Sequence, residues 1–119
     1  MDAQQRANLE NAGIDIKTAL ERFMNNEAML QKYLNRFLSE KSYGMLQEAI
    51  KEGNQDGAKA AAHMLKSVCG TIGCVRMQQM VLAQEREMIN KNWEAAVSMM
   101  PEIEAEYARI CKLLTDNLQ

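Results

Sequence analysis

The stretch AAHMLKSVCGTIG, residues 61 to 73, carries a helical pattern of apolar side chains and the only histidine of the chain. Apolar residues recur there at steps of three and four, which places them along one face of an α-helix. Stepping about 100° per residue puts His63 on the face opposite this apolar stripe. The pattern therefore predicts a helix over 56–69 that ends in GTIG (70–73) and displays His63 to solvent.

Patterns of the same kind flank this stretch on both sides. Apolar residues at helical spacing predict helices over 14–24, 27–50, 75–90 and 93–118. We expect Gly44 to weaken the second of these locally, and Pro101 to kink the last without breaking it. Residues 1–13 form either a short helix or a frayed arm. No strand-like alternation occurs, so the predicted fold class is all-α: an antiparallel four-helix bundle with one or two short N-terminal helices.

Length and composition restrict the possible functions. With 119 residues, the chain is expected to form one domain over 1–119. The net charge of −2 argues against a nucleic-acid partner, which would require a basic surface. No apolar run approaches the roughly 20 residues that cross a bilayer, and the polar N-terminus is unlike a signal peptide. Three cysteines without a disulfide framework fit a reducing cytoplasm, so we expect a cytoplasmic protein without a membrane partner.

The residues around His63 favour a chemical role over an ordinary surface position. Lys59 and Lys66, four residues before and three after it, place two cations beside the imidazole on one helix face. Cations discourage protonation of the ring, which keeps it a neutral nucleophile, and they attract an anion attached to it. Small residues on the same face leave room for a macromolecule to approach closely: Ala60, Ser67 and Gly70.

Several neighbouring residues have two interpretations each. In an antiparallel helix pair that reverses at 70–73, Glu85 lies near the level of His63. It either orients the imidazole by holding one ring proton or is one more solvated helix charge. Gly70 either ends its helix or gives a partner close access. Met64 either borders a docking surface or belongs to the edge of the core. The rim charges that could set partner selectivity are Lys59, Arg76 and Arg86.

The pattern Ala62-His63-x-Leu65-Lys66-Ser67-x-x-Gly70-x-Ile72-Gly73, with Glu85 further along, resembles the signature of histidine-containing phosphotransfer (HPt) domains. The resemblance extends over residues 14–118. It implies a four-helix bundle that carries a phosphoryl group between receiver domains in a two-component phosphorelay. It also implies roles for single residues: His63 as phosphoacceptor, Lys66 as the cation near the phosphoryl oxygens, Gly70 as the close-approach position and Glu85 as the ring-orienting group.

The chain departs from the family pattern at four positions. Ser67 stands where the family usually has glycine, and Cys69 and Cys74 stand where it has small residues. Gln84 occupies a place that is commonly leucine. Serine is small enough to leave access to His63, although docking could become tighter or more selective.

The resemblance implies a phosphocarrier rather than an enzyme. Phosphoryl transfer needs positioning and positive charge, most of which the receiver would supply together with its Mg²⁺. No carboxylate cluster near His63 suggests a metal site, and no Walker pattern suggests ATP binding, so we expect no cofactor on this chain. The expected partners are a response-regulator receiver domain and a hybrid sensor histidine kinase. The short length and the initiating Met1 favour a free-standing carrier.

Two other functions are compatible with parts of the sequence. One is a metal or cofactor bundle that uses His63 with Cys69, Cys74 and Cys111. The cysteine spacing lacks the close pairs of zinc sites, and Cys69 lies on the core face of its helix. The other is a catalytically silent HPt-like helical adaptor, which binds a partner without accepting a phosphoryl group.

Overall fold

Five helices of this protein begin at a residue whose side chain caps them, whereas the last three α-helices begin without such a cap. In the computed structural model, which describes all residues 1–119, side-chain oxygens of capping residues accept hydrogen bonds from the backbone N–H groups of the first helical turn. The capping residues are Asp2, Asp15, Asn26, Glu40 and Asn54. Two helices end at glycines in the left-handed region, Gly53 with φ 71° and Gly73 with φ 84°.

The chain contains α-helices and one short 3₁₀ turn, and it has no strand, which confirms the all-α prediction. The elements are α1 (Ala3–Asn11), α2 (Ile16–Arg22), α3 (Glu27–Arg36), η1 (Phe37–Ser39), α4 (Lys41–Glu52), α5 (Gln55–Ile72), α6 (Val75–Ile89), α7 (Trp93–Ser98) and α8 (Met100–Leu118). Residues 1–13 therefore contain a short helix rather than a frayed arm.

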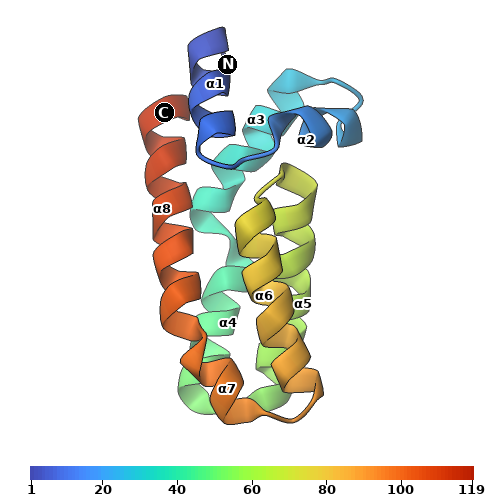
Figure 1. The fold of residues 1–119 in the computed structure, drawn as a ribbon, viewed down its shortest axis with the longest axis vertical. Coiled ribbons are helices and arrows are strands. Elements are labelled where there is room, and N and C mark those ends of the chain that lie inside the picture. Colours follow the sequence, from blue (N-terminus) through green and yellow to red (C-terminus); the bar gives the residue numbers. More distant parts are fainter.

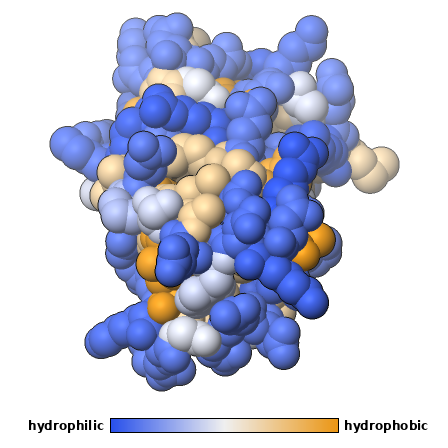
Figure 2. All heavy atoms as spheres, turned by 60° about the horizontal axis from the view of Figure 1, so that its bottom comes forward, coloured by the Kyte–Doolittle hydropathy of each residue, from blue (hydrophilic) through white to orange (hydrophobic).

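The bundle is built around α5, which packs most extensively against α4 and α6. Figure 1 shows α8 running along the length of the molecule beside α3 and α4, while α1, α2 and both chain termini lie at one end. The other end holds α7 and the turn that joins it to α6. None of the helices is both long and apolar enough to span a lipid bilayer. The face shown in Figure 2 is mainly hydrophilic, with apolar surface in patches between charged and polar residues.

The prediction of one continuous helix over 27–50 is wrong. The chain tightens into η1 and becomes extended at Glu40, with ψ 117°, before α4 begins. Gly44, where weakening was expected, lies inside α4. Two hydrogen bonds that helical periodicity does not reveal stabilise this break. The Glu40 carboxylate accepts one from the Ser42 N–H and so caps α4, and the Tyr107 hydroxyl donates one of 2.6 Å to the Phe37 carbonyl. Because the α-helix does not continue, the only backbone hydrogen bond to that carbonyl is a long one of 3.4 Å from the Glu40 N–H, which leaves room for the hydroxyl.

The continuous helix predicted over 93–118 is also divided. It is interrupted at Met99, between α7 and α8, and Pro101 lies in the first turn of α8. Proline is tolerated in a first turn because its missing N–H would have no helical partner there. The backbone at Met99 stays in the right-handed helical region, so the chain changes direction at this point without an extended linker.

Candidate functional site

His63 projects from the middle of α5 into solvent. Its side chain is 66% exposed, whereas Ala62 and Leu65 beside it in sequence are buried in the core. The exposed placement predicted from the helical pattern is therefore confirmed, and a buried core histidine is excluded. The imidazole is free to meet a second protein on the face that points away from the bundle.

One ring nitrogen of His63 is held by a carboxylate of the neighbouring helix. His63 Nδ1 lies 2.8 Å from Glu85 Oε2, which comes from α6. A carboxylate oxygen can only accept a hydrogen bond, so Nδ1 carries the proton and donates it. In the neutral ring this leaves the lone pair on Nε2, which is the nitrogen available for nucleophilic attack.

Glu85 is buried, with a side chain only 7% exposed, although it binds two polar groups at the surface. Its second oxygen, Oε1, accepts a hydrogen bond of 2.6 Å from Lys66 Nζ. Burial alone would raise the pKa of Glu85, but the hydrogen bonds from Lys66 and His63 outweigh it and lower the pKa below its ordinary value. Of the two interpretations of Glu85, the solvated helix charge is wrong, and the contact with the imidazole is present.

The two lysines beside His63 are not equivalent. Lys66 is 22% exposed and paired with Glu85, and its Nζ lies 3.4 Å from His63 Nδ1. Since both of these nitrogens carry protons directed at Glu85, their separation is a close approach and not a hydrogen bond. Lys59 is exposed and forms no ion pair. The two cations expected beside the ring therefore differ in their partners, because the charge of Lys66 is shared with Glu85 whereas Lys59 lines the adjoining surface unpaired.

An apolar hollow lies directly beside the imidazole. It has a volume of about 560 Å³ and is formed by residues of α5 and α6: Asp56, Lys59, Ala60, His63, Met64, Glu85 and Ile89. Met64 and Ile89 are exposed apolar side chains, 43% and 58% accessible. Met64 thus borders this surface and is not a core residue. The sequence did not predict that Ile89 contributes to this surface, because Ile89 lies at the end of a helical apolar pattern with nothing to connect it to His63.

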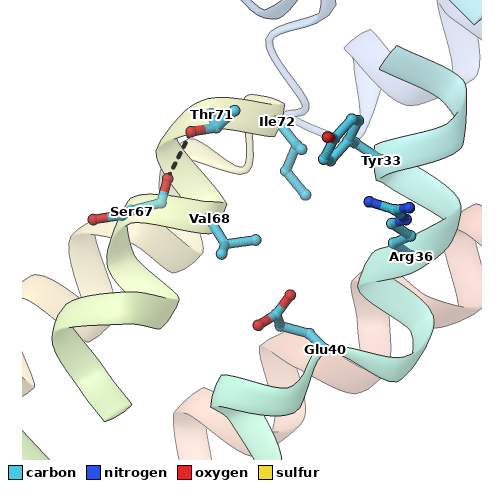
Figure 3. Close-up of a pocket in the computed structure, with 7 residues that line it drawn as sticks. All are labelled: Tyr33, Arg36, Glu40, Ser67, Val68, Thr71 and Ile72. Carbon is cyan, nitrogen blue, oxygen red and sulfur yellow. Dashed lines mark hydrogen bonds between the residues drawn. The ribbon is translucent and has the colours of Figure 1, made fainter. Parts of the chain in front are cut away.

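A second hollow of about 340 Å³ lies on another side of α5, between it and the broken α3–η1–α4 segment (Figure 3). Val68 extends into this hollow, whereas the Ser67 hydroxyl points away from it. Ser67 Oγ donates a hydrogen bond of 3.2 Å to the carbonyl of His63, one turn earlier, and Thr71 Oγ1 donates one of 2.9 Å to the carbonyl of Ser67. Ser67 is exposed on α5, at the rim of this hollow and one turn after His63.

Gly70 lies inside α5, so the interpretation of Gly70 as the helix end is wrong, and Gly73 holds that position. The space where a Gly70 side chain would project is filled by the side chain of Gln78 from α6. In addition, Arg22 Nη1 of α2 donates a hydrogen bond of 2.6 Å to the Gly70 carbonyl. Gly70 thus permits close packing of neighbouring chain segments, and its predicted role in partner access stays a prediction.

Arg22 and Gln78 are contacts that sequence reasoning missed. Gln78 could have been found, because Gly70–Gln78 and His63–Glu85 share one antiparallel register of α5 and α6. Arg22 carried no such signal, since the orientation of α2 depends on tertiary packing. Of the predicted rim charges, Arg76 lines a hollow against Glu102 and Arg109 of α8 and so faces away from the apolar hollow beside His63.

The cysteines are placed in the interior. Cys69 and Cys74 are buried and Cys111 is half-buried, all as free thiols. Burial raises the pKa of Cys74 to about 12, and it raises the pKa of Cys69 as well. No group of three or more histidine, cysteine, aspartate or glutamate side chains is arranged to hold a metal ion. Cys69 and Cys74 therefore pack as small apolar residues, as expected from the sequence.

Comparison with known families gives one match. A family model described as "Hpt domain" matches residues 28–112, which is most of the chain and includes His63, Lys66 and Glu85. The comparison with curated proteins and the comparison with solved structures each give no match. The matched region begins after α2, so the two N-terminal helices lie outside it.

Proposed function

Because this chain belongs to the Hpt domain family, we propose that it is a phosphocarrier of a two-component phosphorelay that accepts a phosphoryl group on His63. Hpt domains are carriers and not enzymes in the usual sense, so the receiver provides most of the catalytic groups. The observation that carries the proposal is an exposed imidazole whose Nδ1 proton is fixed by Glu85 and whose Nε2 lone pair faces solvent.

The geometry supports the following reaction. The Nε2 lone pair of His63 attacks the phosphorus of an aspartyl phosphate on the receiver. The N–P bond forms as the P–O bond breaks, and the aspartate leaves as a carboxylate. The proton on Nδ1 stays in its hydrogen bond with Glu85, which stabilises the positive charge that the ring gains. The reverse reaction passes the group to another receiver.

Positive charge near the transferred group comes from this chain and from the partner. We assign to Lys66 the role of offsetting charge on the phosphoryl oxygens, because it is the lysine nearest the imidazole. To do so, the Lys66 ammonium group must either break its hydrogen bond with Glu85 or contact Glu85 and the phosphoryl oxygens at the same time. The receiver's Mg²⁺ would supply the remaining positive charge, and this chain would need no cofactor.

Docking of the receiver is assigned to the face around His63. The apolar hollow formed by Ala60, Met64 and Ile89 offers a contact for apolar side chains next to the reacting nitrogen. Ser67, Gly70 and the exposed Lys59 extend this face along α5. A protein–protein contact of ordinary size buries about 800 Å² per partner, enough to cover all of these positions. The proposed partners are a response-regulator receiver domain and a hybrid sensor histidine kinase, in the cytoplasm.

Incubation with a phosphorylated receiver tests the proposal. We expect the chain to gain an acid-labile, alkali-stable label, and His63→Gln to gain none while keeping the melting temperature of the parent chain. Label of equal amount on His63→Gln would contradict the proposal. Receiver binding without any label on the parent chain would instead support the catalytically silent adaptor.

A further inference from the structure

The two nitrogens of the His63 imidazole have different surroundings. Nδ1 lies 2.8 Å from Glu85 Oε2, and Lys66 Nζ lies 3.4 Å from the same nitrogen. Nε2 lies on the other edge of the rigid planar ring, so a phosphoryl group bound there is attached at the edge away from Lys66 Nζ. A cation near the Nε2 edge would contact that group without disturbing the hydrogen bonds of Glu85.

A second lysine borders the apolar hollow beside the imidazole. Helical side chains lean toward the helix N-terminus, so the ring of His63 extends over the preceding turn of α5. Lys59 and Ala60 line the hollow at that turn, and the small Ala60 leaves the space above it open. We propose that Lys59 is a further catalytic residue, whose ammonium group contacts the phosphoryl oxygens when the group is on Nε2. This inference rests on the proposed function and adds a residue to it.

The neighbouring helix leaves Lys59 available for this contact. The antiparallel register that places His63 beside Glu85 places Lys59 at the level of Ile89, four residues away on each helix. Ile89 is apolar and 58% exposed, so α6 offers no carboxylate to Lys59 at this level. The lysine stem can lie along apolar surface while its ammonium group stays in solvent and keeps its mobility. Lys66, in contrast, is held by Glu85.

Asp56 is the other charged residue of α5 that lines the hollow. It lies three residues before Lys59 and is exposed, and the structure shows no ion pair between the two side chains. An exposed ion pair of this kind would be weak. A phosphoryl group carries a charge of about −2 and three acceptor oxygens, so it attracts the Lys59 ammonium group more strongly than one carboxylate does. Lys59 would also offset the repulsion between Asp56 and the phosphoryl group.

A small phosphoryl donor separates contact with the phosphoryl group from docking of a partner. Phosphoramidate needs no docking surface: His63 Nε2 attacks its phosphorus, the P–N bond of the donor breaks, and ammonia leaves. We expect Lys59→Met to slow the labelling of His63 by phosphoramidate about fivefold, the upper range for one ionic contact at an exposed site. Lys59→Arg, which keeps the charge, should be labelled at nearly the parent rate.

Lys91→Met is the matched control. Lys91 and Lys59 line a neighbouring hollow together, but Lys91 does not line the one beside His63. Its removal takes away the same charge and should leave the phosphoramidate rate unchanged. Equal slowing of the two Met variants would reveal a general electrostatic effect and overturn the inference. Slowing of Lys59→Met with a phosphorylated receiver but not with phosphoramidate would assign Lys59 to docking alone, which would also overturn it.

Phosphorus-31 NMR of the labelled chain gives a second readout. A cation in contact with the phosphoryl group favours its doubly charged form and so lowers its pKa. We expect the pKa of the phosphoryl group to be higher in Lys59→Met than in the parent chain, and unchanged in Lys91→Met. The same pKa in a folded Lys59→Met would contradict the inference.

The two donors also distinguish this inference from the proposed function. A parent chain that takes label from phosphoramidate but none from a phosphorylated receiver would contradict the proposed function alone. A parent chain that phosphoramidate does not label at His63 would overturn both.

Discussion

Glu85 shows how burial and hydrogen bonding combine at a single residue. Burial favours the neutral acid, yet Lys66 and His63 both donate to the carboxylate, and the net effect is a pKa below the ordinary value of 4.5. A carboxyl group whose pKa is lower in the folded state contributes stability above its unfolded-state pKa. That contribution is lost as the pH falls through the folded-state pKa.

This balance predicts the behaviour of the protein in acid. Between about pH 5 and pH 3, the free energy of unfolding should fall more for the parent chain than for Glu85→Gln, which has no proton to take up at this position. Denaturant unfolding at several pH values measures the difference. Parallel pH profiles for the two proteins would show that the Glu85 contacts do not stabilise the folded state.

Gln84, next to Glu85, is a buried polar residue whose side-chain amide is only partly hydrogen-bonded. Its Nε2 donates a hydrogen bond of 3.0 Å to the Ala96 carbonyl, but its Oε1 is buried without a hydrogen-bond partner. The Ala96 carbonyl also accepts from the backbone N–H of Met99, so it keeps a partner without Gln84. Gln84 therefore stabilises the fold less than an apolar residue of its size would.

We predict that Gln84→Leu raises the free energy of unfolding by about 1 kcal/mol, because it removes the unpaired buried oxygen. The two side chains are similar in volume, so the core should accept the change. Thermal and denaturant unfolding of the two proteins measure it. A less stable Gln84→Leu would show that the contact with Ala96 outweighs the unpaired oxygen.

At the scale of elements, sequence and structure agree on helix type and differ on helix continuity. Periodicity predicted α5 and α6 because their apolar faces repeat without interruption. The breaks at η1 and Met99 were missed because apolar spacing continues across both. The interruption at η1 involves a residue seventy positions away, Tyr107, whose ring also packs against Phe37 with centroids 5.2 Å apart. Local patterns do not contain such a contact.

The hydrogen bond from Tyr107 to the Phe37 carbonyl should stabilise this break. We expect Tyr107→Phe to lower the free energy of unfolding by about 1 kcal/mol, because the carbonyl loses its best donor while the ring packing is kept. Tyr43→Phe is the matched control, since its ring stacks on Tyr107 but its hydroxyl bonds only the side chain of Gln47. Similar losses in the two variants would mean that the Phe37 bond is not the stabilising contact.

At the scale of the molecule, the sequence predicted which helix faces form the site, but it did not predict the burial and ion pairing of the charged residues there. The exposure of His63 followed from one helical wheel, and the level of Glu85 followed from the antiparallel register of two helices. The burial of Glu85 and its bond to Lys66 did not follow, because QEREM is a charged segment that is expected to be solvated. Those features depend on how closely α5 and α6 pack, which Gly70 and Gln78 help to set.

The most direct test of the account is the position of the phosphoryl group. The chain is incubated with a phosphorylated receiver, and phosphorus-31 and nitrogen-15 NMR locate the new N–P bond. The account predicts a single phosphoramidate at Nε2 of His63, with the proton retained on Nδ1. A bond at Nδ1, or a phosphoryl group on any other residue, would contradict it.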